Sequence, residues 1–241
     1  MKKILLFSTA LLILSSCLIA QKQINDANAE VREVPAFHGV KSSHGITVYL
    51  NQSNAIAVAV SANDTEHRNK IKTVVEDGIL KIYFETENWK VWKNFSNKNL
   101  RVYVSAKDLD LIHASSGSDI VIEGSIKSGD LTMDASSGAS IKGKIEASSL
   151  EVDQSSGSTI IISGTIDGKL KIEGSSGSTF RGYNLTVENC DAESSSGAGI
   201  EVTVNKELSV EASSGGYIYF KGNGLIRDVH TSSGGSVTRK S

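Results

Sequence analysis

The sequence contains little cysteine: Cys17 and Cys190 are the only two among 241 residues. If the chain is cleaved after Ala20, Cys190 is the only cysteine left and cannot form an internal disulfide bond. A chain of about 220 residues is long enough to bury one sizeable core. We therefore expect packing and backbone hydrogen bonds, rather than disulfides, to stabilise the fold.

The sequence also lacks a hydrophobic run long enough for a transmembrane helix, which needs about 20 apolar residues. Its longest apolar run, ILLFSTALLILSS, follows Lys2 and Lys3, as in a secretory signal peptide. Residues 1–20 are therefore predicted to be a signal peptide. Two processing routes fit: ordinary cleavage after Ala20, or a lipoprotein box, LSSC, with the lipid on Cys17. Either route predicts an exported protein that is periplasmic, on the outer membrane surface or secreted, and that contacts the membrane only through such a lipid.

There is no excess of positive charge. The formal net charge is −2, and it becomes −4 when Lys2 and Lys3 are removed with the signal peptide. Nucleic-acid binding needs a basic face, so nucleic acid is not expected as a partner. The sequence also has no Walker loop, no zinc-ligand spacing and no G-x-S-x-G elbow. We therefore expect no cofactor and no catalytic residue.

What the sequence does contain is seven copies of Ser-Ser-Gly, 17–21 residues apart. Scattered serine and glycine would suggest a flexible linker, but a near-constant spacing predicts a stack of similar coils. The first serines of the seven copies are Ser115, Ser136, Ser155, Ser175, Ser195, Ser213 and Ser232.

Aliphatic side chains recur at fixed distances from these serines. They lie five and three residues before the first serine and five residues after it, for example Leu170, Ile172 and Ile160. All three offsets are odd, so these residues share one face of an extended chain. One repeat cannot bury this face alone, but stacked repeats can. We predict parallel coils over about 106–239, with Ser-Ser-Gly at a tight corner where only small residues fit and glycine tolerates positive φ.

Residues 30 to 105 are also predicted to be strand-rich but less regular, forming early coils or a small sheet that caps the solenoid. The segment RNKIKTVVEDG, which begins at Arg68, fits a short helix or a strand and turn. Residues 21–29 are predicted to be a linker, and residues 30–241 a single domain.

An acidic column precedes the corners. Two residues before successive Ser-Ser-Gly copies lie five carboxylates, flanked by His113 and His230. Two interpretations stay open: a strip that binds divalent cations, which prefer oxygen ligands, or a solvated acidic face. Like charges one strand apart repel, so we expect raised carboxylate pKa values in either case. The five carboxylates are Asp134, Asp153, Glu173, Glu193 and Glu211.

An aromatic segment, YFETENWKVWKNF (83–95), contains both tryptophans of the chain. Tyr83, Trp89 and Trp92 are candidate ligand-binding residues that could form a platform for sugar rings or a partner protein. The alternative interpretation is a hairpin or loop whose aromatic side chains plug the solenoid.

The chain resembles a known bacterial family on four features: F-x-x-V from Phe37 to Val40, the strand GITVYL, the segment VEDGILKIYF and the tandem Ser-Ser-Gly coils. Over about residues 30–239 it is similar to the "putative auto-transporter adhesin, head GIN domain" family. The resemblance implies an all-β protein, a right-handed parallel β-helix, exported by Bacteroidetes-type bacteria. It supplies no catalytic residue and no ligand.

Three functions follow from these observations. The first is a non-enzymatic cell-envelope protein for adhesion or scaffolding, with a surface glycan or a protein as partner. The alternative is a module that binds a glycan or small ligand through residues 83–95. A polysaccharide-degrading β-helix enzyme is the third, and it is disfavoured because its acidic substrates need a basic cleft where this sequence offers acidic columns.

Overall fold

The computed structural model describes residues 26–85 and 98–241. Strand makes up 66% of the structure, and stacked parallel coils form a β-solenoid of about six turns, one between each pair of successive Ser-Ser-Gly corners. No helix within the described ranges is long and apolar enough to cross a membrane. The predicted all-β solenoid is therefore confirmed.

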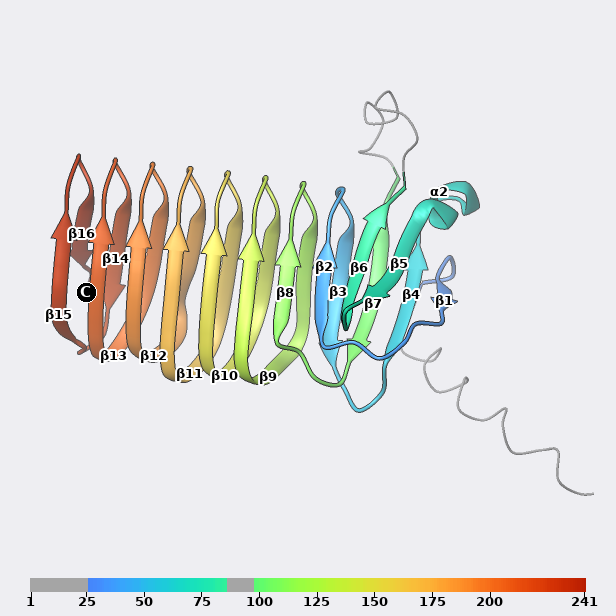
Figure 1. The fold of residues 1–241 in the computed structure, drawn as a ribbon, viewed down its shortest axis with the longest axis horizontal. Coiled ribbons are helices and arrows are strands. Elements are labelled where there is room, and N and C mark those ends of the chain that lie inside the picture. Colours follow the sequence, from blue (N-terminus) through green and yellow to red (C-terminus); the bar gives the residue numbers. More distant parts are fainter. Residues whose placement is uncertain (1–25, 86–97) are drawn as a thin grey trace, which may run out of the picture.

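The elements fall into two groups (Figure 1). The irregular N-terminal part contains β1 (Glu30–Arg32), β2 (Gly39–Ser42), β3 (Thr47–Gln52), β4 (Ala57–Ser61), α2 (Thr65–Lys70), β5 (Ile71–Glu76), β6 (Ile79–Phe84) and β7 (Arg101–Ala106). The coils contain β8 (Leu111–Ala114), β9 (Asp119–Ala135), β10 (Ser140–Gln154), β11 (Thr159–Gly174), β12 (Thr179–Ser194), β13 (Gly199–Ala212), β14 (Tyr217–Lys221), β15 (Leu225–Thr231) and β16 (Ser236–Arg239).

Each long strand from β9 to β13 bends and so belongs to both walls of the solenoid. The chain runs from one corner down the far wall, turns at the bend and returns up the near wall to the next corner (Figure 1). The far wall consists of β3, the first halves of β9 to β13, β14 and β16, and the near wall consists of β2, β8, the second halves of β9 to β13 and β15. Because successive coils advance toward the C-terminal end in this sense, the helix is right-handed. Neighbouring coils pair in parallel along almost their whole length, as between β10 and β11.

The core lies between the two walls and consists of stacked aliphatic side chains. Ile141, Ile160 and Phe180 occupy equivalent places on β10, β11 and β12, and each is 0% exposed. The predicted core positions are buried in every coil except the last. There Val229 is 45% exposed, contrary to the prediction, because no further strand within the described residues covers its side of the coil.

The Ser-Ser-Gly corners are tight turns with two left-handed residues. In the first copy Ser116 has φ 51° and Gly117 has φ 71°, and the Ser118 N–H donates to the Ser115 carbonyl at 3.1 Å. Positive φ at both central residues defines a type I′ turn, whose twist matches that of strands. A Cβ on Gly117 would meet nothing within 4 Å. The prediction that only small residues fit there is therefore wrong: the backbone conformation, not lack of room, favours glycine.

An additional corner precedes the seven predicted ones. His44 (φ 64°) and Gly45 (φ 66°) adopt the same conformation between β2 and β3. The Gly45 N–H donates to the Ser116 carbonyl at 3.0 Å, and the corner glycines from Gly117 to Gly215 donate to the next coil in the same way. The solenoid therefore begins near residue 39, and residues between β3 and β8 are an insertion into its first coil.

This insertion supplies the predicted cap at the N-terminal end. β7 pairs with β3 in parallel and with β4 antiparallel, and β4 pairs antiparallel with β1. On the other wall, β6 pairs with β2 in parallel and with β5 antiparallel. The segment that begins at Arg68 combines both predicted forms, since α2 ends at Lys70 and β5 follows directly.

Candidate functional site

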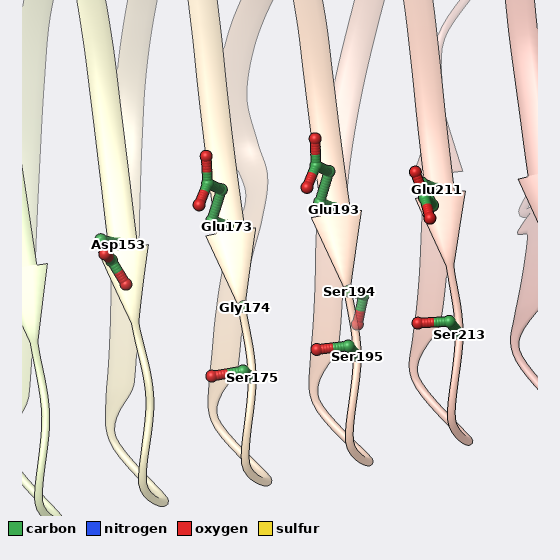
Figure 2. Close-up of a pocket in the computed structure, with 9 residues that line it drawn as sticks. All are labelled: Asp153, Glu173, Gly174, Ser175, Glu193, Ser194, Ser195, Glu211 and Ser213. Atoms are coloured by element: carbon green, nitrogen blue, oxygen red, sulfur yellow. The ribbon is translucent and has the colours of Figure 1, made fainter.

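The five predicted carboxylates form one outward-facing line, which we call the acidic ladder. Each pairs with the next through the strand register, and Figure 2 shows the last four, Asp153 to Glu211, on successive strands of the near wall. His113 adjoins the first carboxylate, with its Nδ1 atom 3.4 Å from Asp134 Oδ2. His230 pairs with Glu211 at the other end. The structure therefore brings together all seven predicted residues: His113, Asp134, Asp153, Glu173, Glu193, Glu211 and His230.

A groove of about 320 Å³ runs beside the acidic ladder. One side is formed by the carboxylates and the other by the first serines of three corners, with Gly174 and Ser194 between them (Figure 2). Ser194 is buried, and its hydroxyl donates to the Ala198 carbonyl at 2.8 Å. The groove therefore presents carboxylate and hydroxyl oxygens at one-strand intervals. The serines are Ser175, Ser195 and Ser213.

A lysine compensates the charge of the acidic ladder at Glu173. The Lys171 ammonium lies 2.7 Å from Glu173 Oε1 and 3.1 Å from Glu151 Oε1, and these two carboxylates raise the pKa of Lys171. By contrast, partial burial, followed by the charges of Asp134 and Glu173, raises the pKa of Asp153. The expected rise in carboxylate pKa is therefore found at Asp153.

The ladder geometry bears on the cation interpretation. Neighbouring carboxylates stand side by side on parallel strands, and across residues 26–85 and 98–241 no group of three His, Cys, Asp or Glu side chains could hold a metal ion. Cation binding by the acidic ladder stays a prediction, to be checked by adding calcium during thermal unfolding.

Asp153→Asn is expected to stabilise the protein modestly at pH 7. The raised pKa means that the folded state binds a proton more readily than the unfolded chain, so deprotonation of Asp153 disfavours folding. The wild-type protein should therefore gain stability from this group as the pH falls through the raised pKa toward the unfolded value. The advantage of the variant should shrink over the same interval.

Urea unfolding of both proteins between pH 7 and pH 4 measures this difference. Asp167→Asn is the matched control because Asp167 lies exposed on β11, away from the acidic ladder, and it should show no such trend. An advantage of Asp153→Asn that stays constant with pH would contradict the assignment.

Only one of the predicted aromatic ligand residues lies in the described ranges. Trp89 and Trp92 lie outside them. Tyr83 is half-buried on β6 and pairs with Lys72 of β5, within the N-terminal cap. The adjacent Phe84 is buried, with its ring centroid 6.2 Å from that of His67. Tyr83 therefore belongs to a different surface from the acidic ladder.

A second groove, of about 610 Å³, lies on the outer face of the far wall. Lys142, Lys144 and Arg181 line it together with Ile161 and Tyr183, and we call it the basic groove. The three cationic side chains are exposed. This groove was not predicted from the sequence, because its cationic residues do not belong to the column that precedes each corner. The outward positions six and eight residues after the first serine would have revealed it.

Cys190 occupies a core position and is free and buried. Burial, and secondarily the charge of Asp191, raises the pKa of its thiol. A thiol held protonated in an apolar environment is a poor nucleophile, so this cysteine fills space in the core.

A family model matches residues 36–224, described as "Putative auto-transporter adhesin, head GIN domain". The chain belongs to this family. The match covers most of the N-terminal cap and most of the coils. No curated protein matches the chain.

Solved structures with the same fold include proteins from Bacteroides and Parabacteroides. A "putative adhesin" from Bacteroides fragilis superposes with a TM-score of 0.78 at 14% identity, over 88% of this chain and 96% of the other. A "putative adhesin" from Parabacteroides distasonis gives 0.66 at 18% identity, over 88% and 96%. A "putative lipid binding protein" from Parabacteroides distasonis gives 0.64 at 17% identity, over 90% and 98%. At these identities the likeness concerns the fold.

Proposed function

We propose that this protein is a non-enzymatic, exported member of the head GIN domain family that acts in adhesion or scaffolding at the cell envelope. In this proposal residues 1–20 are a signal peptide, 21–29 a linker and 30–241 one rigid domain. The partner is a surface glycan or a protein, and any membrane contact is made by a lipid on Cys17.

The observation that carries the proposal is the acidic ladder with its serine-lined groove. It repeats the same chemical groups across consecutive coils, about 4.7–4.9 Å apart. A surface of this kind suits an extended partner, because each coil can make the same contact and weak contacts add up along a polymer. Its rigidity follows from continuous parallel pairing, which leaves little conformational entropy to lose on binding.

The proposal of a non-enzymatic role is supported by the environment of one thiol and two buried hydroxyls. The Cys190 thiol is buried and protonated. Ser158 and Ser178 are buried below the corners, and their hydroxyls donate to carbonyls of the preceding coil, at 2.9 Å for Ser158 and Ala135. These hydroxyls therefore serve the fold.

Export is tested by mass spectrometry of the protein from its native host. A chain that starts at Gln21 supports ordinary cleavage, and a diacylated Cys17 supports the lipoprotein route. An intact Met1 would contradict both.

Adhesion is tested with a deletion strain of the bacterium that makes the protein, complemented either with the wild type or with the double variant Glu173→Gln and Glu193→Gln. Attachment to glycan-coated and protein-coated surfaces should fall in the deletion strain, return with the wild type and return only partly with the variant. The control pair Glu85→Gln and Glu123→Gln, two exposed carboxylates away from the acidic ladder, should restore attachment fully. Equal attachment by all strains would contradict the proposal.

A second candidate function is binding of a carboxylated glycan in the basic groove. It is favoured by Lys142, Lys144 and Arg181, which line the groove together with Tyr183 and one carboxylate, Glu201. Guanidinium groups bind carboxylates in pairs of hydrogen bonds, and aromatic rings stack on sugars. The alternative predicted from the sequence, a glycan platform in residues 83–95 with Tyr83 on the cap, stays open beside it.

Arg181→Glu is expected to weaken binding of an acidic polysaccharide such as polygalacturonate at least about tenfold, because it removes a cation and adds a repulsive charge. Titration calorimetry measures the loss, with Lys107→Glu, an exposed lysine outside the groove, as control. Substitution of Tyr83, Trp89 and Trp92 by alanine tests the other surface in the same assay. Binding lost only in that triple variant would favour residues 83–95 over the basic groove.

A further inference from the structure

The C-terminal end of the solenoid leaves an apolar strand uncovered. β15 pairs with β13 on one side, and no described strand pairs with its other edge (Figure 1). Leu225, Ile226 and Val229 are 60%, 42% and 45% exposed, and they are half of the six large hydrophobic side chains that are exposed in the described part of the chain. Ile226 and Val229 occupy core positions, since they pair with buried Leu208 and Val210.

The other wall of this end is covered by cationic side chains. The Arg239 guanidinium lies 5.7 Å from the Phe220 ring centroid, and the Lys240 ammonium lies 3.9 Å from that of Tyr219. Val237 of β16 is partly buried against the core. The exposed apolar surface of the last coil is therefore concentrated on β15, whereas the N-terminal end carries the cap of antiparallel strands.

The backbone of β15 is also oriented for pairing. The Ser232 N–H donates to the Ala212 carbonyl at 3.0 Å, so this end of β15 is bonded to β13 through its even-numbered residues. In a parallel sheet a residue directs both its N–H and its C=O to the strand on one side, and the next residue directs both groups to the strand on the other side. Val229 and Thr231 therefore present their N–H and C=O groups at the open edge, which is a template for another strand.

We propose that two copies of this chain pair end to end through β15, antiparallel, about a two-fold axis at Val229. Val229 of one copy then lies opposite Val229 of the other, and their exchanged backbone hydrogen bonds join the two near walls into one sheet. On the outer face Asp228 of each copy lies opposite His230 of the other, so two carboxylate–imidazole pairs form.

Charge complementarity selects this register and this occupant. Registers centred on residue 228 or residue 230 satisfy the same backbone alternation, but they place Asp228 opposite Asp228 or His230 opposite His230. Like charges directly opposite are unfavourable in sheets, whereas opposite charges stabilise the pair. A two-fold interface requires a surface that complements itself, and the sequence Asp-Val-His meets that requirement around its central residue.

The pairing is tested by measuring the molar mass in solution of the full chain as the bacterium that makes it processes it. Sedimentation from low to high micromolar concentration should show a dimer that dissociates on dilution. Val229→Lys should raise the dissociation constant at least about tenfold, because it sets two ammonium groups at the centre of the interface. Val74→Lys is the matched control, since Val74 is 39% exposed on β5 in the cap, and it should leave the dimer intact. A monomer at every concentration, or a Val229→Lys dimer as tight as the wild type, overturns the proposal.

The register is tested by mixing two variants that each introduce one cysteine, Asp228→Cys and His230→Cys, under mild oxidation. In the proposed pairing these positions are directly opposite in a non-hydrogen-bonded pair, with Cα atoms about 4.5 Å apart, within the range of a disulfide. The mixture should form a covalent dimer, whereas each variant alone should not. Covalent dimers from Asp228→Cys alone or from His230→Cys alone would refute the register centred on Val229. Both variants carry the further substitution Cys17→Ser, and Cys190 does not interfere because it is buried.

Discussion

Ile160→Asp is expected to abolish cooperative folding, at a cost of about 4 kcal/mol or more. Ile160 is 0% exposed and stacks between Ile141 and Phe180 in the adjacent coils. An aspartate there would place a carboxylate in an apolar interior without a partner, and would remove the contacts of a branched side chain with both neighbours. Because each coil is stabilised by the next, the defect should spread beyond the coil that carries it.

Urea unfolding followed by circular dichroism measures the loss. Ile161→Asp is the control, since Ile161 is the next residue of β11, points outward and lies between Lys142 and Arg181 in the strand register. The same chemical change should there cost little, because the new carboxylate is solvated and lies beside two cations. Equal destabilisation by both substitutions would mean that the alternation of inward and outward residues is wrong.

The core of the coils could be predicted from the sequence because stacking imposes one rule on every repeat. Residues equidistant from a corner must face the same way, so Ile120, Ile141 and Phe180 are recognisable as core residues by their spacing alone. The same rule fails at Val229 because burial depends on the next coil as well as on the direction of the side chain. Sequence alignment gives the direction but not the presence of a neighbour.

The additional corner at His44 and Gly45 was not predicted because the Ser-Ser-Gly pattern identifies a repeat by its serines. The turn itself requires a backbone conformation rather than a second serine. His44 replaces the second serine and still adopts φ 64°, and the glycine at the next position is what the eight corners share. Likewise, no pattern in residues 53–110 indicates that β4 pairs with β7, because antiparallel pairing across a long insertion depends on chain topology rather than on local composition.

The acidic ladder was predicted as a column because its members share one offset from the corner. Its electrostatics could not be predicted in the same way, since Lys171, which shares a different column with Glu151, reaches Glu173. The basic groove combines Lys142 and Arg181 of one column with Lys144 and Tyr183 of another. Sites formed by several columns need the lateral spacing of strands, which a single aligned offset does not contain.

Gly164→Ala is expected to destabilise the protein by about 3 kcal/mol or more. Gly164 has φ 118° at the bend of β11, a conformation that alanine rarely adopts. A Cβ there would lie 1.9 Å from the Ile145 carbonyl oxygen of the preceding coil. This oxygen belongs to the backbone of a paired strand, so it cannot move aside without breaking the hydrogen bonds between the two strands. The cost of the backbone conformation and the cost of the steric overlap therefore add together.

Gly157→Ala at the corner separates these two causes. Gly157 also has positive φ, 70°, but a Cβ there would meet nothing within 4 Å. Only the left-handed conformation is then penalised, by about 1–2 kcal/mol. Thermal and urea unfolding of the two variants should therefore rank Gly164→Ala well below Gly157→Ala in stability. If the two substitutions cost the same, backbone conformation alone would explain both glycines, and the close approach of successive coils at the bend would not constrain the sequence.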